Sequence, residues 1–250
     1  MQKKRGRRVL RWILGSLALV LVLAVGGVLI WSQVGVMQAE PAPLASVRDN
    51  PEISVEDAAE GIVLTPSDGD SELGLVFVPG AKVDPWAYAA ILQGLVEDGV
   101  TVVITRPWLN LAFFDLRGLD SFTSAAPDIE TWAVGGHSLG GVRACQLAAD
   151  ADALVLFGSY CATDVSDSDL AVLSIAGSED GLSTPEKIAA ARDLLPADAE
   201  LVEIAGASHA SFGDYGPQAG DGTPTISADE MHATVTGLLD DFVAQQLATR

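Results

Sequence analysis

The chain begins with an apolar stretch that differs in kind from everything after it. Residues 12–32 carry no charged side chain, and the first acidic residue is Glu40. Six of the Lys and Arg residues fall within the first eleven positions. An apolar run of about 20 residues spans a bilayer core, and a basic flank stays on the cytoplasmic side. The pattern predicts a basic cytoplasmic tip over 1–11 and a transmembrane anchor over 12–32, with the remainder on the extracytoplasmic side of a cell membrane.

A signal peptide that is cleaved to release a secreted protein is the alternative interpretation of the same segment. Its apolar region is usually about 7–15 residues long, shorter than the run found here. Ala39 is small enough for a peptidase site, but Met37 two positions earlier fits such a site poorly. We therefore prefer an uncleaved anchor, and both interpretations export the rest of the chain.

Beyond this segment the hydrophobic pattern changes twice. Residues 33–60 contain several prolines and scattered acids without a sustained period, which predicts a linker. From residue 61, short β-branched runs alternate with stretches of helical spacing, which predicts an α/β domain over 61–250. The expected strands are 61–64, 73–78, 100–105, 132–135, 153–157, 171–176 and 200–204. The expected helices are 86–98, a short one within 119–128, 139–149, 184–195 and 227–248. The sheet should be mostly parallel, with helices on both faces and a ligand site beyond the carboxyl ends of its strands.

Charge narrows the classes of partner. The chain has 14 Lys and Arg against 34 Asp and Glu, a net charge of −20. A surface of this sign argues against nucleic acid, because phosphate binding needs clustered basic side chains. With only three His residues and no ligand spacing among the acids, we expect no metal and no cofactor.

The strongest chemical signal follows the expected strand 132–135. The sequence Gly136-His-Ser138-Leu-Gly140 has the G-x-S-x-G pattern between a strand and a helix, where a sharp turn lifts a serine hydroxyl clear of the sheet. Glycines two residues before and after the serine avoid collisions with the neighbouring helix and strand. We predict that Ser138 is a nucleophile.

A serine nucleophile needs a base whose pKa is near neutral. His137 lies inside the turn and is interpreted as a packing residue, and His232, among acids early in the last helix, as a surface residue. His209 follows the last strand at the correct sheet edge, and we predict that it is the base.

The acid that orients this base should lie between the serine and the histidine along the chain, because enzymes with this strand–serine–helix turn have the order serine, acid, histidine. Asp180 is the first choice because it follows the strand 171–176 in a tight loop closed by Gly181. Glu179 beside it is the alternative, and Asp164 after the preceding strand is a third.

Two backbone N–H groups should receive the oxyanion. One is that of Leu139, directly after the nucleophile, and the other comes from the loop after the strand 73–78. Within that loop we choose Ala81, with its neighbour Lys82 as the other candidate. The side chains of Lys82, Phe212, Tyr215 and Gln218 are candidates for the substrate pocket.

The segments Phe77-Val-Pro-Gly-Ala-Lys-Val-Asp-Pro85, Gly135-Gly-His-Ser-Leu-Gly-Gly141, Gly177-Ser-Glu-Asp-Gly181 and His209-Ala-Ser-Phe-Gly-Asp-Tyr-Gly-Pro-Gln-Ala-Gly-Asp-Gly222 together resemble the α/β-hydrolase superfamily. More narrowly, they are similar to small exported esterases of the dienelactone-hydrolase (carboxymethylenebutenolidase) type. The resemblance implies Ser138, Asp180 and His209 as the triad. The chain departs from true dienelactone hydrolases, whose nucleophile is Cys, so the resemblance transfers a reaction class and no substrate.

These features predict a membrane-anchored serine hydrolase that cleaves small esters through an acyl-enzyme. The alternatives are a thioesterase, an amidase or an acyltransferase using the same triad, and a non-catalytic binding protein of the cell envelope with a hydrolase fold. Cys145 and Cys161 are either a disulfide, which an exported domain permits, or two buried thiols.

Overall fold

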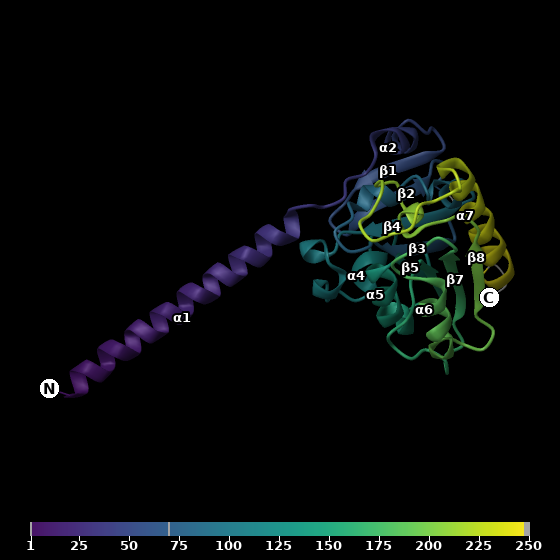
Figure 1. The fold of residues 1–250 in the computed structure, drawn as a ribbon. Helices are drawn as coiled ribbons and strands as arrows, with labels where there is room; N and C mark the ends of the chain where they lie inside the picture. Colours follow the sequence, from purple (N-terminus) through teal and green to yellow (C-terminus); the bar gives the residue numbers. More distant parts are fainter. Residues whose placement is uncertain (1, 70, 248–250) are drawn as a thin grey trace. The chain divides into compact units, whose positions relative to one another are not determined.

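A computed structural model describes residues 2–69 and 71–247 (Figure 1). The chain divides into two units, Met1–Val36 and Met37–Arg250. The first consists of helix α1 (Gln2–Gln33), whose stretch Arg11–Gln33 has a mean hydropathy of 2.8 and is long and apolar enough to cross a membrane. Large apolar side chains from Trp12 to Trp31 are exposed along it.

The second unit is built on one eight-stranded sheet with the order β1-β2-β4-β3-β5-β6-β7-β8. The strands β1 and β2 pair antiparallel, as do β2 and β4, and all other neighbours are parallel. The strands are β1 (Ile53–Asp57), β2 (Gly61–Pro66), β3 (Leu73–Val78), β4 (Val100–Thr105), β5 (Thr131–His137), β6 (Ala153–Phe157), β7 (Ala171–Gly177) and β8 (Glu200–Ile204). A mostly parallel sheet is confirmed. The strands from β5 to β8 follow β3 in chain order on one side of it, whereas β4 lies on its other side, next to β2 and β1.

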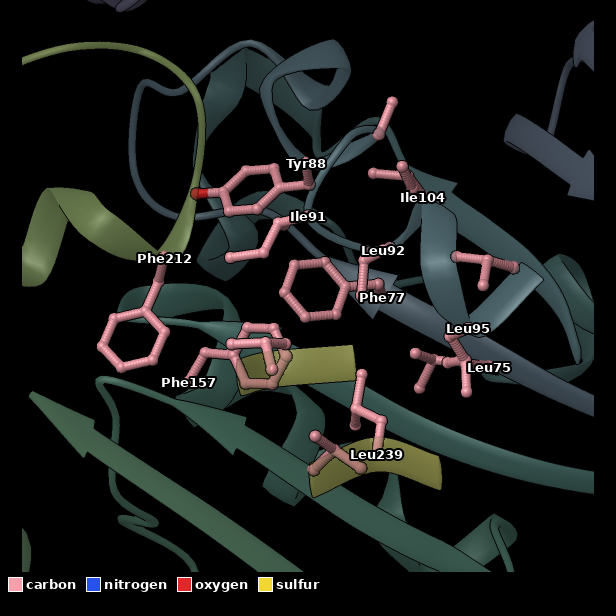
Figure 2. Close-up of a cluster of buried hydrophobic side chains, with 14 of the residues drawn as sticks. Leu75, Phe77, Tyr88, Ile91, Leu92, Leu95, Ile104, Phe157, Phe212 and Leu239 are labelled. Atoms are coloured by element: carbon pink, nitrogen blue, oxygen red, sulfur yellow. The ribbon is translucent and has the colours of Figure 1, made fainter. Parts of the chain in front are cut away.

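Alternate residues of the central strands feed two apolar layers. Leu75 and Phe77 of β3 face the side that carries α3 (Gln93–Glu97) and α7 (Ala228–Phe242), whereas Val76 of the same strand faces the side of α5 (Leu139–Leu147). Figure 2 shows the first layer, in which the Phe77 ring lies 5.2 Å from Tyr88 and 5.3 Å from Phe157 between centroids. Helices therefore cover both faces, as predicted, and leave the strand ends for a site.

Several segments differ from the sequence prediction, among them the expected helix 184–195, which is divided into α6 (Pro185–Ala190) and a 3-10 turn, Arg192–Leu194. Residues 33–60, expected to be a linker, contain α2 (Pro41–Arg48) and β1, because β1 completes the sheet by pairing with β2. The expected helix 86–98 is divided into a 3-10 turn, Pro85–Tyr88, and the short α3. The closing helix α7 is followed by a π-helical turn, Val243–Leu247, and Ala248 lies outside the described residues.

The remaining helices are α4 (Asp120–Thr123), α6 (Pro185–Ala190) and several single 3-10 turns, of which His209–Phe212 is the most relevant to the site. Cys145 of α5 is bonded to Cys161 after β6, with 5.6 Å between their Cα atoms. The two cysteines therefore form a disulfide between the helix that follows Ser138 and the segment that follows the neighbouring strand.

Candidate active site

Ser138 occupies a strained turn between β5 and α5. Its backbone angles are φ 54° and ψ −123°, a region that non-glycine residues rarely enter. A Cβ atom at Gly140 would lie 1.9 Å from the carbonyl oxygen of Val78, and one at Gly136 would lie 2.5 Å from the carbonyl carbon of Gly140. The two glycines thus permit the tight turn that the sequence pattern predicts.

The loop after β6 braces this turn. The N–H of Ser138 donates to the carbonyl of Phe157 at 3.0 Å, and the hydroxyl of Ser159 donates to the carbonyl of Ser138 at 2.7 Å. Gly141 leaves room for Ser159, whose Oγ would be 2.4 Å from a Cβ at that position. The backbone N–H and C=O of Ser138 are therefore both hydrogen-bonded, which holds the turn in place.

The acid and the base meet at the same sheet edge. Nδ1 of His209 is 2.8 Å from Oδ2 of Asp180, and both side chains are almost completely buried. The other oxygen of Asp180 accepts the N–H groups of Leu182 and Ser183 at 2.8 and 2.7 Å. These bonds fix the carboxylate, which in turn fixes the orientation of the imidazole.

A second carboxylate connects the two loops that carry this pair. Oδ1 of Asp221 accepts the N–H groups of Gly181 and His209 at 3.1 and 3.0 Å, and Oδ2 accepts that of Ala210 at 2.8 Å. Partial burial raises the pKa of Asp221, but these backbone hydrogen bonds outweigh it and hold the pKa below its ordinary value. Asp221 therefore stays ionised and ties the residue after Asp180 to the base itself.

The base also rests on a buried aromatic layer. The His137 ring lies 4.4 Å from the His209 ring between centroids, and its Nδ1 is 2.9 Å from the hydroxyl of Tyr88. Burial lowers the pKa of His137 far below its usual range, and the neighbouring His209 lowers it further. His137 is thus a neutral packing residue, as predicted, and does not repel a positive charge on His209.

The hydrogen bond between the nucleophile and the base is not formed in this structure. Among the described residues, neither Oγ of Ser138 nor the buried Nε2 of His209 has a hydrogen-bond partner. Such bonds are often long or poorly aligned without substrate and tighten in the complex. The structure thus joins Asp180 to His209 and stacks the base on the residue before Ser138.

Two N–H groups remain available near the turn. Leu139 is the first residue of α5, so its N–H has no carbonyl one turn earlier to donate to. In the loop after β3, the N–H of Gly80 donates to Tyr88 and that of Lys82 donates to Asn110. Between them, Ala81 has no such partner within the described residues, which favours it over Lys82 as the second oxyanion donor.

The four candidate pocket residues have different surroundings. Phe212 is completely buried, with its ring 5.7 Å from that of Phe157, so it packs the core and does not line an open pocket. Tyr215 is 7% exposed, and its hydroxyl donates to Gln218 at 3.1 Å, so these two side chains order their own loop. Lys82 has φ 57°, and its main chain joins neighbouring loops.

His232, expected at the surface, is partly exposed and paired with an acid. Its Nε2 is 3.1 Å from Oδ1 of Asp214, and its side chain is 25% exposed. The hydrogen bond to Asp214 raises the pKa of His232, against the opposing effect of partial burial. This pair connects α7 to the loop after His209 and is separate from the proposed triad.

The sequence alone gave Ser159 no place around the site. It offered Tyr88 only as part of a family motif and Asp221 only as a side chain that could order the turn in its own loop. Asp221 carries a visible signal, because a lone acid between Gly220 and Gly222 is typical of a turn whose side chain bonds backbone N–H groups. Ser159 has no such signal. In the described part of the chain, no group of three His, Cys, Asp or Glu side chains has the arrangement of a metal site.

Comparison with known proteins supports the fold. No curated protein matches the chain. Solved structures with a similar fold include the esterase domain of a Rhodothermus marinus protein (TM-score 0.58, 77% of this chain and 98% of that one) and a Xanthomonas campestris α/β serine hydrolase without a lid (0.53, 78% and 95%). A third is a dienelactone hydrolase-like promiscuous phosphotriesterase from metagenomic libraries (0.51, 76% and 96%), and all three are 17% identical to this chain.

The model of the alpha/beta hydrolase family matches residues 74–233, which include Ser138, Asp180 and His209. This range covers most of the sheet and every loop at the candidate site. The chain therefore belongs to the alpha/beta hydrolase family.

Proposed function

We propose that the protein is a serine hydrolase that cleaves small carboxylic esters through an acyl-enzyme. The observation that carries the proposal is the strained turn at Ser138 beside a buried Asp180–His209 pair, at the carboxyl edge of the sheet. A serine held in this conformation serves no packing purpose that a glycine would not serve better, because φ is positive.

Ser138 Oγ attacks the ester carbonyl carbon while Nε2 of His209 takes its proton. The tetrahedral oxyanion receives hydrogen bonds from the N–H groups of Leu139 and Ala81. The imidazolium, stabilised by Asp180, then gives the proton to the departing alkoxide, and the acyl group stays on Ser138. Water attacks this ester and passes a proton to Nε2 of His209. His209 then returns that proton to Ser138 Oγ as the carboxylic acid leaves, so both the serine and the base are restored.

The apolar helix α1 supports a proposal for the location of the second unit, Met37–Arg250, which we call the hydrolase unit. We propose that Arg11–Gln33 is an uncleaved anchor and that the unit from Met37 onward lies on the extracytoplasmic side. The Cys145–Cys161 disulfide supports this side, because such bonds persist in oxidising compartments. After extraction with alkaline carbonate, the full-mass chain should stay with the membranes. A shortened chain in the soluble fraction would support signal cleavage instead.

Activity-based labelling tests the hydrolase assignment. Full-length protein should react with a fluorophosphonate probe, and Ser138→Ala should abolish the labelling. Ser124→Ala, which removes an exposed serine after α4, is the matched control and should label like the parent. Labelling of Ser138→Ala at unchanged stoichiometry would overturn the assignment.

A substrate panel tests the bond type. p-Nitrophenyl esters from acetate to laurate should be cleaved fastest at short chain lengths, since the proposal is for small acyl groups. Matched thioester and anilide substrates define the alternatives. Faster turnover of either one than of every ester would replace the esterase proposal.

A further inference from the structure

Exposed apolar side chains of the hydrolase unit are concentrated in one loop. We call residues 107–116, which follow β4, the β4 loop. Four of its side chains are exposed, namely Trp108 (55%), Phe113 (57%), Phe114 (47%) and Leu116 (78%). In the described part of Met37–Arg250, the other large apolar side chain with comparable exposure is Leu201 on β8 (41%). A patch of this kind marks an interaction surface.

The β4 loop lies at the catalytic edge of the sheet. Because β4 is parallel to β3, the chain leaves it at the same edge where β5 delivers Ser138. The carbonyl of Asn110 in this loop accepts the N–H of Lys82 at 2.8 Å. The patch therefore borders the loop that supplies the proposed oxyanion donor Ala81.

Met37, the first residue of the hydrolase unit, is hydrogen-bonded to the loop that contains Ala81. The N–H of Met37 donates to the carbonyl of Lys82, and the N–H of Asp84 donates to the carbonyl of Met37, both at 2.8 Å. Residues 34–36 alone separate Met37 from the last residue of α1, and three residues reach roughly 10–15 Å at full extension. If α1 is an anchor, as proposed above, covalent connectivity keeps this edge of the unit near the bilayer.

Charge also distinguishes the β4 loop from the rest of this acidic unit. Asp115 is the one acid in the loop, and it is 4% exposed and bonded to Arg117 at 2.6 Å. Arg106 and Arg117 flank the loop, and Nη2 of Arg117 donates to the carbonyl of Arg106 at 2.9 Å. The loop thus presents aromatic and aliphatic groups without an exposed carboxylate, so it can approach lipid headgroups that repel an acidic surface.

We propose that the β4 loop inserts its apolar side chains into the headgroup region of the bilayer that holds α1. Trp and other aromatic side chains are favoured at that depth. This contact turns the catalytic edge toward the membrane, where Ser138 meets esters of small acyl groups whose apolar alcohol portion is dissolved in the interface. The proposal rests on the anchor, and its substrate class deepens the proposed esterase function.

Site-specific quenching tests the contact in the full-length protein. Leu116→Cys and the matched control Leu201→Cys are labelled with an environment-sensitive fluorophore and reconstituted into phosphatidylcholine–phosphatidylglycerol liposomes that contain spin-labelled lipid. The label at 116 should shift to shorter wavelength and be quenched, and the label at 201 should not. Equal quenching at both positions, or none at 116, would overturn the contact, as would a shift at 116 that depends on protein concentration in detergent and indicates a second copy.

Two further readouts separate this proposal from those on which it rests. Flotation of the protein with liposomes reports the anchor, so a chain that does not float overturns both the anchor and the contact. Fluorophosphonate labelling of the same sample reports the hydrolase site alone. The double variant Phe113→Ser/Phe114→Ser should turn over a bilayer-dissolved ester on the order of 10-fold more slowly than wild type. Its turnover of a water-soluble ester should equal that of wild type. Unchanged turnover of both esters would contradict the proposal.

Discussion

Asp221 offers a direct test of how the base is held. In Asp221→Asn, the amide oxygen can keep the N–H groups of Gly181 and His209, but the amide nitrogen then faces the N–H of Ala210. One charge-assisted hydrogen bond is lost and two donors are opposed. A hydrogen bond to a charged group contributes about 1.5–3 kcal/mol, and partial exposure of Asp221 favours the lower part of that range.

A loss of about 2 kcal/mol lowers Tm by roughly 4–8 °C in a unit of this size. The effect on catalysis should be larger than this suggests. The lost bond lies next to His209, and a base displaced by about 1 Å can cost on the order of 100-fold. We expect kcat/KM of Asp221→Asn to fall by roughly 10- to 100-fold at a temperature where the variant is fully folded.

The pH dependence separates this role from general destabilisation. The folded-state pKa of Asp221 is below its ordinary value, so its stabilisation is present above the ordinary pKa and is lost as pH falls through the lowered one. The difference in Tm between wild type and Asp221→Asn should therefore be constant near neutral pH and shrink in acid.

Calorimetry and ester hydrolysis at matched pH measure both quantities. Asp164→Asn removes one exposed acid after β6 and is the control, for which kcat/KM should not change. Wild-type kcat/KM in Asp221→Asn would refute the inference that this carboxylate holds the base.

Three other predictions follow from the fold. Cys145→Ser/Cys161→Ser opens a link between residues 16 apart and should cost about 3 kcal/mol, seen as a lower Tm that no longer responds to reductant. The raised pKa of His232 gives stability that is complete below its ordinary pKa and lost as pH rises through the folded-state pKa, so wild-type Tm should decline over that interval and His232→Gln should lack the decline. Gly140→Ala brings a Cβ to 1.9 Å from a backbone oxygen and should cost roughly 3 kcal/mol or more with loss of probe labelling, whereas Gly237→Ala in the open part of α7 should be neutral or stabilising.

The local sequence predicted the elements whose pattern is self-contained. The β-branched runs predicted the parallel strands β3 to β7 closely, because burial on both faces requires continuous apolar residues. The bounds of β8 also match, although most of that edge strand is exposed. The same pattern did not predict the helix α2 and the strand β1 within residues 33–60. Strand β1 has only one buried position, Ile53, so its membership of the sheet depends on pairing with β2 and not on its own composition.

Site chemistry divides in the same way. Ser138, between glycines at the end of a strand, could be identified from neighbours in sequence because the turn itself imposes the pattern. His209 and Asp180 could be placed at the right edge by counting strands, since carboxyl ends of parallel strands share one edge.

Tertiary structure alone decided which groups touch. In the folded chain, Asp180 and not Glu179 is hydrogen-bonded to His209, and Phe212 is buried in the core. Asp221 accepts the N–H of Ala210, eleven residues earlier in the chain, and so holds the turn that carries His209. Those contacts depend on where separate loops cross after the sheet has formed, and a hydrogen bond between distant residues leaves no period in the sequence. The local sequence thus determined the backbone turn at Ser138, whereas the orientation of His209 depends on loops that meet only when the sheet has assembled.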